Sequence, residues 1–125
     1  MGVRRHKTNQ NCPDCGGTFI QWGSMNLVLA NRGACKYTYQ WLKCNSCGNC
    51  AYGILEEFWE VFDDDYFFDL YRAEKNQWEH TYNRLLKCPH PDKYACKCRE
   101  HAFFKHNELP GKSDSIEREQ RLHGS

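Results

Sequence analysis

The segment CPDCGG, from Cys12 to Gly17, has a counterpart in CNSCGN, from Cys44 to Asn49, whose first cysteine lies twenty-nine residues after Cys15. Both segments have the form Cys-x-x-Cys-Gly. In such a turn the glycine permits a positive φ, and the backbone N–H groups point at the two sulfurs. Two such turns that face each other supply four thiolates at the corners of a tetrahedron, which is the geometry of a structural zinc site.

The cysteine content and the lack of a leader both favour metal ligation over disulfides. Nine of the 125 residues are cysteines, and a small cysteine-rich domain replaces part of its core with disulfides or metal ions. The N-terminal MGVRRHKTNQN has no apolar run typical of a signal peptide, and no segment has the length and apolarity of a transmembrane helix. We therefore expect an intracellular protein, cytoplasmic or nuclear, with no membrane association and with reduced thiols.

Charge is distributed unevenly along the chain. Residues 1–55 carry a net charge of +5, residues 56–79 a net charge of −7 and residues 80–112 a net charge of +4, within a total of +1. This pattern excludes a uniformly basic nucleic-acid coat. The acidic block is expected to face water or a basic partner.

The first half of the chain reads as a basic arm followed by β-strands. Residues 1–11 form the arm. The strand candidates are TFIQW (residues 18–22), NLVL (residues 26–29) and KYTYQWL (residues 36–42), with a hairpin turn expected at Asn31-Arg32-Gly33. In the last candidate, Tyr37, Tyr39 and Trp41 share one face, because successive side chains of a strand point to opposite sides.

The spacing CPDCGGTFI…KYTYQWLKCNSCGN resembles that of the zinc ribbon, a β-sheet module of transcription factors, RNA polymerase subunits and many enzymes. The resemblance implies a ribbon over residues 12–53, with one zinc ion held by Cys12, Cys15, Cys44 and Cys47. It does not define a function, because such modules bind nucleic acid, dock on proteins or only stabilise a fold. The acidic pair that cleavage-stimulating ribbons carry at the hairpin tip is missing here.

Other interpretations of the four sulfurs stay open. A rubredoxin-like iron site also uses two such turns, and a redox-active dithiol is a further alternative. Cys44, Cys47 and Cys50 follow part of an iron–sulfur spacing, but Ile54 stands where a fourth cysteine would be expected. We therefore interpret Cys50, like Cys35, as a buried free thiol.

Residues 54–87 show a helical period. Leu55, Phe58, Trp59 and Phe62 recur at intervals of three and four, and Phe67, Leu70, Tyr71, Trp78, Tyr82 and Leu85 continue it after Asp63-Asp64-Asp65. The pattern predicts one or two acidic, aromatic helices. Their aromatic face is expected to be core, with a protein-docking surface as the alternative.

Residues 88–108 form a second cluster of cysteines and histidines. We predict a second zinc site with the ligands Cys88, Cys96, Cys98 and His101, for which His90 is a substitute. A hydrolytic zinc would need an open position and a nearby base such as Glu100. Residues 109–125 are expected to be a polar tail, either a short helix or disordered.

The resulting prediction is an α+β fold: a small N-terminal zinc ribbon packed against central helices, with a C-terminal metal-stapled segment. The expected function is non-enzymatic binding of nucleic acid or transcription proteins. The residues expected to contact nucleic acid are Arg32, Lys36, Lys43, Tyr37, Tyr39 and Trp41. The alternatives are a protein-interaction or inhibitor module that uses the acidic helices, and an electron carrier or zinc hydrolase.

Overall fold

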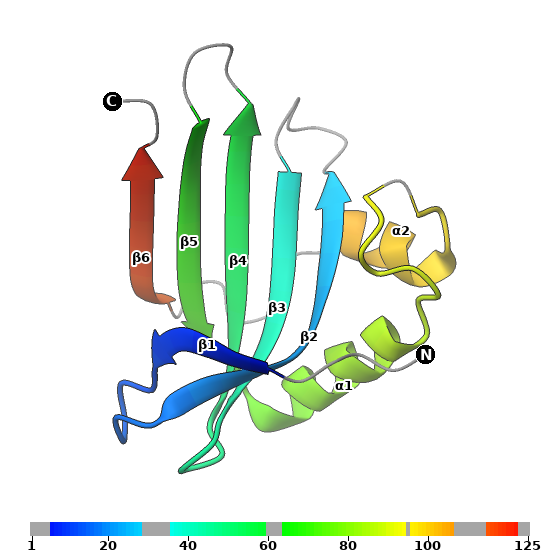
Figure 1. Cartoon of the computed structure of the whole chain (residues 1–125). Coiled ribbons are helices and arrows are strands. Elements are labelled where there is room, and N and C mark those ends of the chain that lie inside the picture. The colour runs from blue at the N-terminus through cyan, green and yellow to red at the C-terminus, as the bar shows by residue number, and fades with distance from the viewer. Residues whose placement is uncertain (1–5, 29–35, 60–63, 95, 107–114, 123–125) are drawn as a thin grey trace.

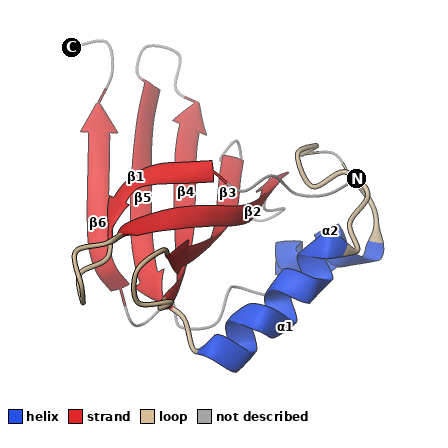
Figure 2. Ribbon diagram, turned by 60° about the horizontal axis from the view of Figure 1, so that its bottom comes forward, coloured by secondary structure: helices blue, strands red, loops and turns tan. Residues whose placement is uncertain are grey.

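Consecutive strands pair antiparallel in sequence order, so that a single six-stranded sheet runs from β1 to β6 (Figure 1). The computed structural model describes residues 6–28, 36–59, 64–94, 96–106 and 115–122. Its elements are β1 (His6–Asn11), β2 (Thr18–Val28), β3 (Lys36–Cys44), β4 (Cys50–Trp59), β5 (Asp64–Arg72), α1 (Lys75–Leu86), α2 (Arg99–His106) and β6 (Ser115–Leu122). The sheet curls into a half-barrel, and β1 runs across the direction of β3 to β6 (Figure 2).

The order of the strands brings the two Cys-x-x-Cys turns to the same end of the sheet. In an antiparallel meander, alternate connections lie at one end. The first turn joins β1 to β2 and the second joins β3 to β4. Because β2 and β3 are neighbours, with Phe19 opposite Cys44, the two turns lie side by side.

The strands predicted in the first half of the chain are present, but residues 6–11, predicted to belong to a flexible basic arm, form β1 and pair with β2. The segments at residues 18–22 and 26–28 belong to one strand, β2, whose pairing with β3 is irregular between Gln21 and Gly23. Leu29, the last residue of the second predicted strand, lies outside the described residues. The segment at residues 36–42 lies in β3. The predicted turn at Asn31-Arg32-Gly33 and the thiol of Cys35 lie outside the described residues.

One face of the sheet packs against both helices. Tyr37, Tyr39 and Trp41 of β3 share this face, as their spacing predicts, and all three are buried. The other members of this core cluster are Met25, Leu27, Cys50, Tyr52, Ile54, Tyr71, Trp78, Leu85, Cys88 and Phe104. A smaller cluster lies on the opposite face, where it includes Cys12 and Cys44 beside Phe19 and Leu42.

The prediction of central helices packed against a ribbon is wrong. Most of residues 54–72 form β4 and β5, and the helical part begins only at Lys75. Both faces of β4 are packed: Tyr52 and Ile54 lie in the helix-covered core, while Ala51 and Leu55 belong to the opposite cluster. A strand that is buried on both faces does not alternate polar and apolar residues, so its aromatic residues fell by chance at helical intervals.

The last expected element also differs. Residues 115–122 were predicted to be a short helix or disordered, but they pair with β5 as β6. The fold is therefore a mainly antiparallel β-sheet, in which α1 and α2 lie in the connection from β5 to β6. Among the described residues, neither helix has the length and apolarity needed to cross a membrane.

A buried hydroxyl fixes α1 against the sheet. Thr81 is 4% exposed, and its Oγ1 lies 2.9 Å from Trp41 Nε1 and 3.0 Å from the Tyr52 hydroxyl. The single hydroxyl hydrogen of Thr81 points to the helix carbonyls of Gln77 and Trp78, so Trp41 and Tyr52 are the donors to its oxygen. Burial raises the pKa of Tyr52 to about 12, which keeps it protonated near neutral pH.

Replacing Thr81 with valine keeps the shape of the side chain but leaves the Trp41 N–H and the Tyr52 O–H without an acceptor. We expect the free energy of unfolding to fall by about 1–3 kcal/mol, the typical cost of an unsatisfied buried polar group. Urea denaturation of the metal-loaded protein measures it. The control is Asn83→Ala on the exposed side of α1, and an equal loss of stability in both variants would contradict this account.

Candidate metal centres

The first centre is formed by the two turns at the end of the sheet. The sulfurs of Cys12, Cys15, Cys44 and Cys47 all lie within 4.8 Å of one another. The Sγ–Sγ distance is 3.7 Å for Cys12 and Cys47 and 3.4 Å for Cys15 and Cys44. A tetrahedron with Zn–S bonds of about 2.3 Å has edges of about 3.8 Å, so the four sulfurs fit one ion after a small adjustment.

The two turns share one backbone geometry. The amide of Cys12 donates to the carbonyl of Gly17 and the amide of Gly16 to that of Cys12, at 2.7 and 2.8 Å. The second turn repeats both bonds between Cys44 and Asn49 and between Gly48 and Cys44, at 2.8 and 3.2 Å. Gly16 and Gly48 have φ of 77° and 78°. This left-handed conformation explains why glycine follows each second cysteine.

Backbone amides favour the thiolate form of Cys44. Burial opposes ionisation, but the N–H groups of Cys47 and Ser46 outweigh it and lower the pKa of Cys44 to about 6. The N–H of Asn49 also favours the thiolate of Cys47, yet burial and the neighbouring cysteines raise the pKa of Cys47 to about 12. Because protons must leave before all four sulfurs can coordinate, metal binding releases protons and weakens as the pH falls.

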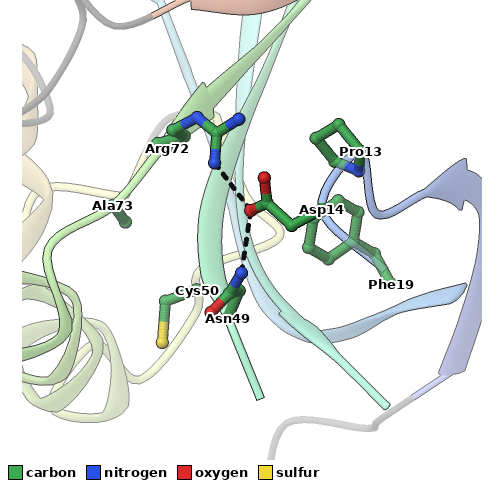
Figure 3. Close-up of a pocket in the computed structure, with 7 residues that line it drawn as sticks. All are labelled: Pro13, Asp14, Phe19, Asn49, Cys50, Arg72 and Ala73. Carbon is green, nitrogen blue, oxygen red and sulfur yellow. Dashed lines mark hydrogen bonds and ion pairs between the residues drawn. The ribbon is translucent and has the colours of Figure 1, made fainter. Parts of the chain in front are cut away.

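A polar chain joins the two turns beside this centre (Figure 3). Asp14 Oδ2 accepts hydrogen bonds from Asn49 Nδ2 at 2.8 Å and from Arg72 at 2.6 Å. The bond from Arg72 is the main reason why the pKa of Asp14 is lowered. These residues line a pocket of about 180 Å³ that also contains Cys50. Burial raises the pKa of the Cys50 thiol, consistent with its predicted position as a buried thiol outside the ligand set.

The second centre lies between the two helices. The ligand atoms of Cys88, Cys96, Cys98 and His101 lie within 4.8 Å of one another, so the structure brings together the four residues that the sequence singled out. The sulfur of Cys88 lies 3.8 Å from that of Cys96, 3.4 Å from that of Cys98 and 3.1 Å from His101 Nδ1. His90, the proposed substitute, is exposed and does not belong to this set.

His101 is oriented by the edge of the sheet. Its ring is fully buried, and Nε2 lies 2.7 Å from the backbone carbonyl of Asn26 in β2. A carbonyl can only accept, so Nε2 carries the hydrogen and Nδ1 is left with a lone pair that points at the three sulfurs. A metal-binding histidine is commonly held in this way by a partner on its other nitrogen.

Asn26 also fixes the loop that carries Cys88. Its amide N–H donates to the carbonyl of Pro91 at 2.8 Å, and its side-chain Nδ2 donates to the carbonyl of Asp92 at 3.0 Å. Its Oδ1 accepts from the hydroxyl of Thr38 at 2.8 Å. The centre is thus attached to β2 beyond the part of that strand that β1 covers.

An ion pair connects the helices around this centre. Arg84 of α1 contacts Glu100 of α2 at 2.9 Å, with both side chains largely buried, and the Arg84 guanidinium lies 3.8 Å from the centre of the Phe103 ring. The carboxylate of Glu100 is therefore already paired with the Arg84 guanidinium. A metal ion held by all four side chains of either centre would have no open position for a catalytic water. The donor set of four sulfurs suits zinc or iron, whereas three sulfurs and one imidazole suit zinc.

The structure separates the residues that were expected to contact nucleic acid. The rings of Tyr37, Tyr39 and Trp41 are at most 5% exposed, so they belong to the core and do not offer a face for stacking. Lys36 and Lys43 are half-buried, and their ammonium groups lie 4.5 Å from the rings of Tyr94 and Trp22. Arg32 lies outside the described residues.

The acidic residues assigned to helices occupy other elements. Glu56 and Glu57 lie in β4, and Asp64, Asp65 and Asp69 lie in β5. Glu60 and Asp63 lie outside the described residues. Within the described residues, these acids therefore lie in strands and not in the predicted helices. Binding of a protein partner by this part of the chain stays a prediction.

Comparison of the chain with protein-family models, with curated proteins and with solved structures finds no match. The resemblance to zinc ribbons therefore depends on the cysteine spacing and on the turns alone. The structure supports two clusters that are compatible with zinc, without a family assignment.

Sequence reasoning did not find Asn26 or the Asp14–Arg72 pair. Asn26 acts on His101 through its backbone carbonyl, across seventy-five positions of the chain, and a backbone group leaves no residue-type signal. Arg72 and Asp14 are fifty-eight positions apart. Only the sheet, which places the end of β5 beside the first turn, brings them together.

We predict that each chain binds two zinc ions and that either ion can be lost without the other. Cys12→Ser should reduce the metal content by one ion, and Cys88→Ser should do the same, because each variant breaks one four-ligand set. Cys50→Ser is the matched control and should retain both ions. Native mass spectrometry with elemental analysis measures the content, and loss of an ion from the Cys50 variant would contradict the assignment.

Proposed function

We propose that this protein is a non-enzymatic, zinc-stapled binding module that binds nucleic acid through the loop of its second centre. This loop, residues 87–99, is called the basic loop below. The proposal is based on the charge of the basic loop. This loop exposes Lys87, Lys93, Lys97 and Arg99 and the single acid Asp92.

The metal does not cancel this charge. A divalent ion with three thiolates and a neutral imidazole has a net charge of −1, while the basic loop has four cations and one acid. The loop therefore stays positive with the ion bound. Cations that meet phosphates supply most of the affinity of non-specific nucleic-acid binding.

The contacts of the basic loop support a preformed surface. Cys88, Cys96 and Cys98 converge on one point within it, and Asn26 donates hydrogen bonds to the carbonyls of Pro91 and Asp92. Lys36 extends the surface from β3, because its ammonium group lies over the ring of Tyr94. A surface that is ordered before binding loses less conformational entropy when a ligand binds.

The closed centres support a binding role over catalysis. Each offers four candidate protein ligands, and Glu100, which precedes His101 in the chain, is paired with Arg84. The resemblance of residues 12–53 to zinc ribbons is what supports a role near transcription proteins.

The test is fluorescence anisotropy with labelled single-stranded and duplex oligonucleotides over a series of salt concentrations. We expect a dissociation constant of about 10⁻⁴–10⁻⁶ M near physiological salt, with affinity falling steeply as salt rises. Lys93→Ala and Lys97→Ala should each weaken binding several-fold. Each should also reduce the slope of log K against log salt by about 0.7–0.9 if its phosphate contact is lost.

The control is Lys75→Ala, which removes an exposed positive charge from the first residue of α1, about 16 Å along the helix from Leu86 at 1.5 Å per residue. This variant should bind as the parent protein does. All variants are compared at equal zinc content. Absence of binding at low salt, or equal weakening by Lys75→Ala, would overturn the proposal.

A further inference from the structure

We propose that the first centre is an oxidisable thiolate site: a peroxide joins Cys15 to Cys44 as a disulfide and releases the metal ion, while the second centre keeps its ion. This inference is independent of nucleic-acid binding. It depends on three differences: solvent access and charge differ between the two centres, and the hydrogen bonds at sulfur differ within the first centre.

The first difference is access. Cys15 and Cys47 are exposed at the tips of their turns, so two ligands of the first centre are open to solvent. In the second centre Cys88 and His101 are buried, and Cys96 and Cys98 are only partly exposed. Oxidants react with thiolates that they can reach, so access favours the first centre.

The second difference is charge. Four thiolates around a divalent ion carry a net charge of −2, whereas three thiolates and an imidazole carry −1. The second centre also lies within the basic loop, whose cations stabilise its thiolates. Because a thiolate that is stabilised by its neighbours is a weaker nucleophile, the sulfurs of the first centre are the more reactive ones.

The third difference lies within the first centre. Cys15 accepts one amide hydrogen bond, from Gly17 at 3.4 Å. Cys44 accepts two, from Ser46 at 3.4 Å and from Cys47 at 3.5 Å, and it is buried. Cys15 and Cys47 are both exposed, but the sulfur of Cys15 lies 3.4 Å from that of Cys44, whereas Cys47 lies 3.7 Å from Cys12. The shorter distance assigns the attack to Cys15 and the closing of the disulfide to Cys44.

The proposed chemistry balances with hydrogen peroxide as the oxidant. The Cys15 thiolate attacks one peroxide oxygen, the O–O bond breaks, and with one proton the products are a sulfenic acid and water. The Cys44 thiolate then attacks the sulfenyl sulfur and displaces hydroxide, which a second proton converts to water. Two thiolates lose two electrons in total, and the ion loses two of its four ligands.

The test uses the zinc-loaded full-length protein and one equivalent of hydrogen peroxide. A chromophoric chelator follows free zinc, and mass spectrometry after alkylation maps the disulfides. We expect one ion released per chain, at least about tenfold faster than the second ion, together with a Cys15–Cys44 cross-link. Dithiothreitol and added zinc should restore the original metal content.

Cys15→Ser removes the attacking sulfur but also a metal ligand, so this variant would not separate the two effects. Two other variants are therefore used. Cys96→Ser disables the second centre and should still release the ion of the first. Cys50→Ser removes the thiol nearest the turns and should behave as the parent protein. Equal release from both centres, a first disulfide among Cys88, Cys96 and Cys98, a cross-link that omits Cys15 or Cys44, or no release at all would overturn the proposal.

Discussion

The structure depends on the convergence of Cys12, Cys15, Cys44 and Cys47 at one end of the sheet. Cys12 and Cys15 precede β2, Cys44 ends β3 and Cys47 follows it, so one ion bound to all four would fix the pairing of those strands. A slip of one residue between β2 and β3 would move Cys44 away from its place opposite Phe19 and turn every side chain to the other face. Hydrogen bonds from Asn45 to Thr18 and from Thr18 to Asn45 secure the same register.

The second centre meets a different need of the same sheet. β1 covers β2 only near its beginning, which leaves backbone groups near Asn26 at an open edge. The N–H of Asn26 donates to the carbonyl of Pro91, and its carbonyl accepts from His101. The segment that carries the candidate metal ligands therefore also supplies hydrogen-bond partners to β2. Loss of that ion would therefore disturb the edge of the sheet as well as the two helices. An exposed edge is the part of a sheet most prone to pair with another chain.

The two clusters of candidate metal ligands were predictable from the sequence because coordination depends on residue type and short spacing. The two Cys-x-x-Cys-Gly turns and the ligand set of the second centre could be named in this way, and so could the strands around Tyr39. The strands β4 and β5 could not, because burial on both faces removes the alternation that marks a strand. Nor could β6, whose polar sequence SIEREQRL gains its structure by pairing with β5 at the sheet edge. The sequence left open whether Tyr37, Tyr39 and Trp41 form a stacking surface or part of the core. They are core residues because α1 and α2 pack over them.

The central claim is that metal ions at both centres hold this sheet in its register. Hydrogen exchange measured by NMR tests it most directly, by comparing zinc-loaded protein with protein that has been stripped by a chelator under reducing conditions. The account predicts that the amides of Cys12, Asn26 and Cys44, which donate to Gly17, Pro91 and Asn49, lose their protection when the metal is removed and regain it when zinc is restored. Unchanged protection of these three amides in the stripped protein would contradict the account.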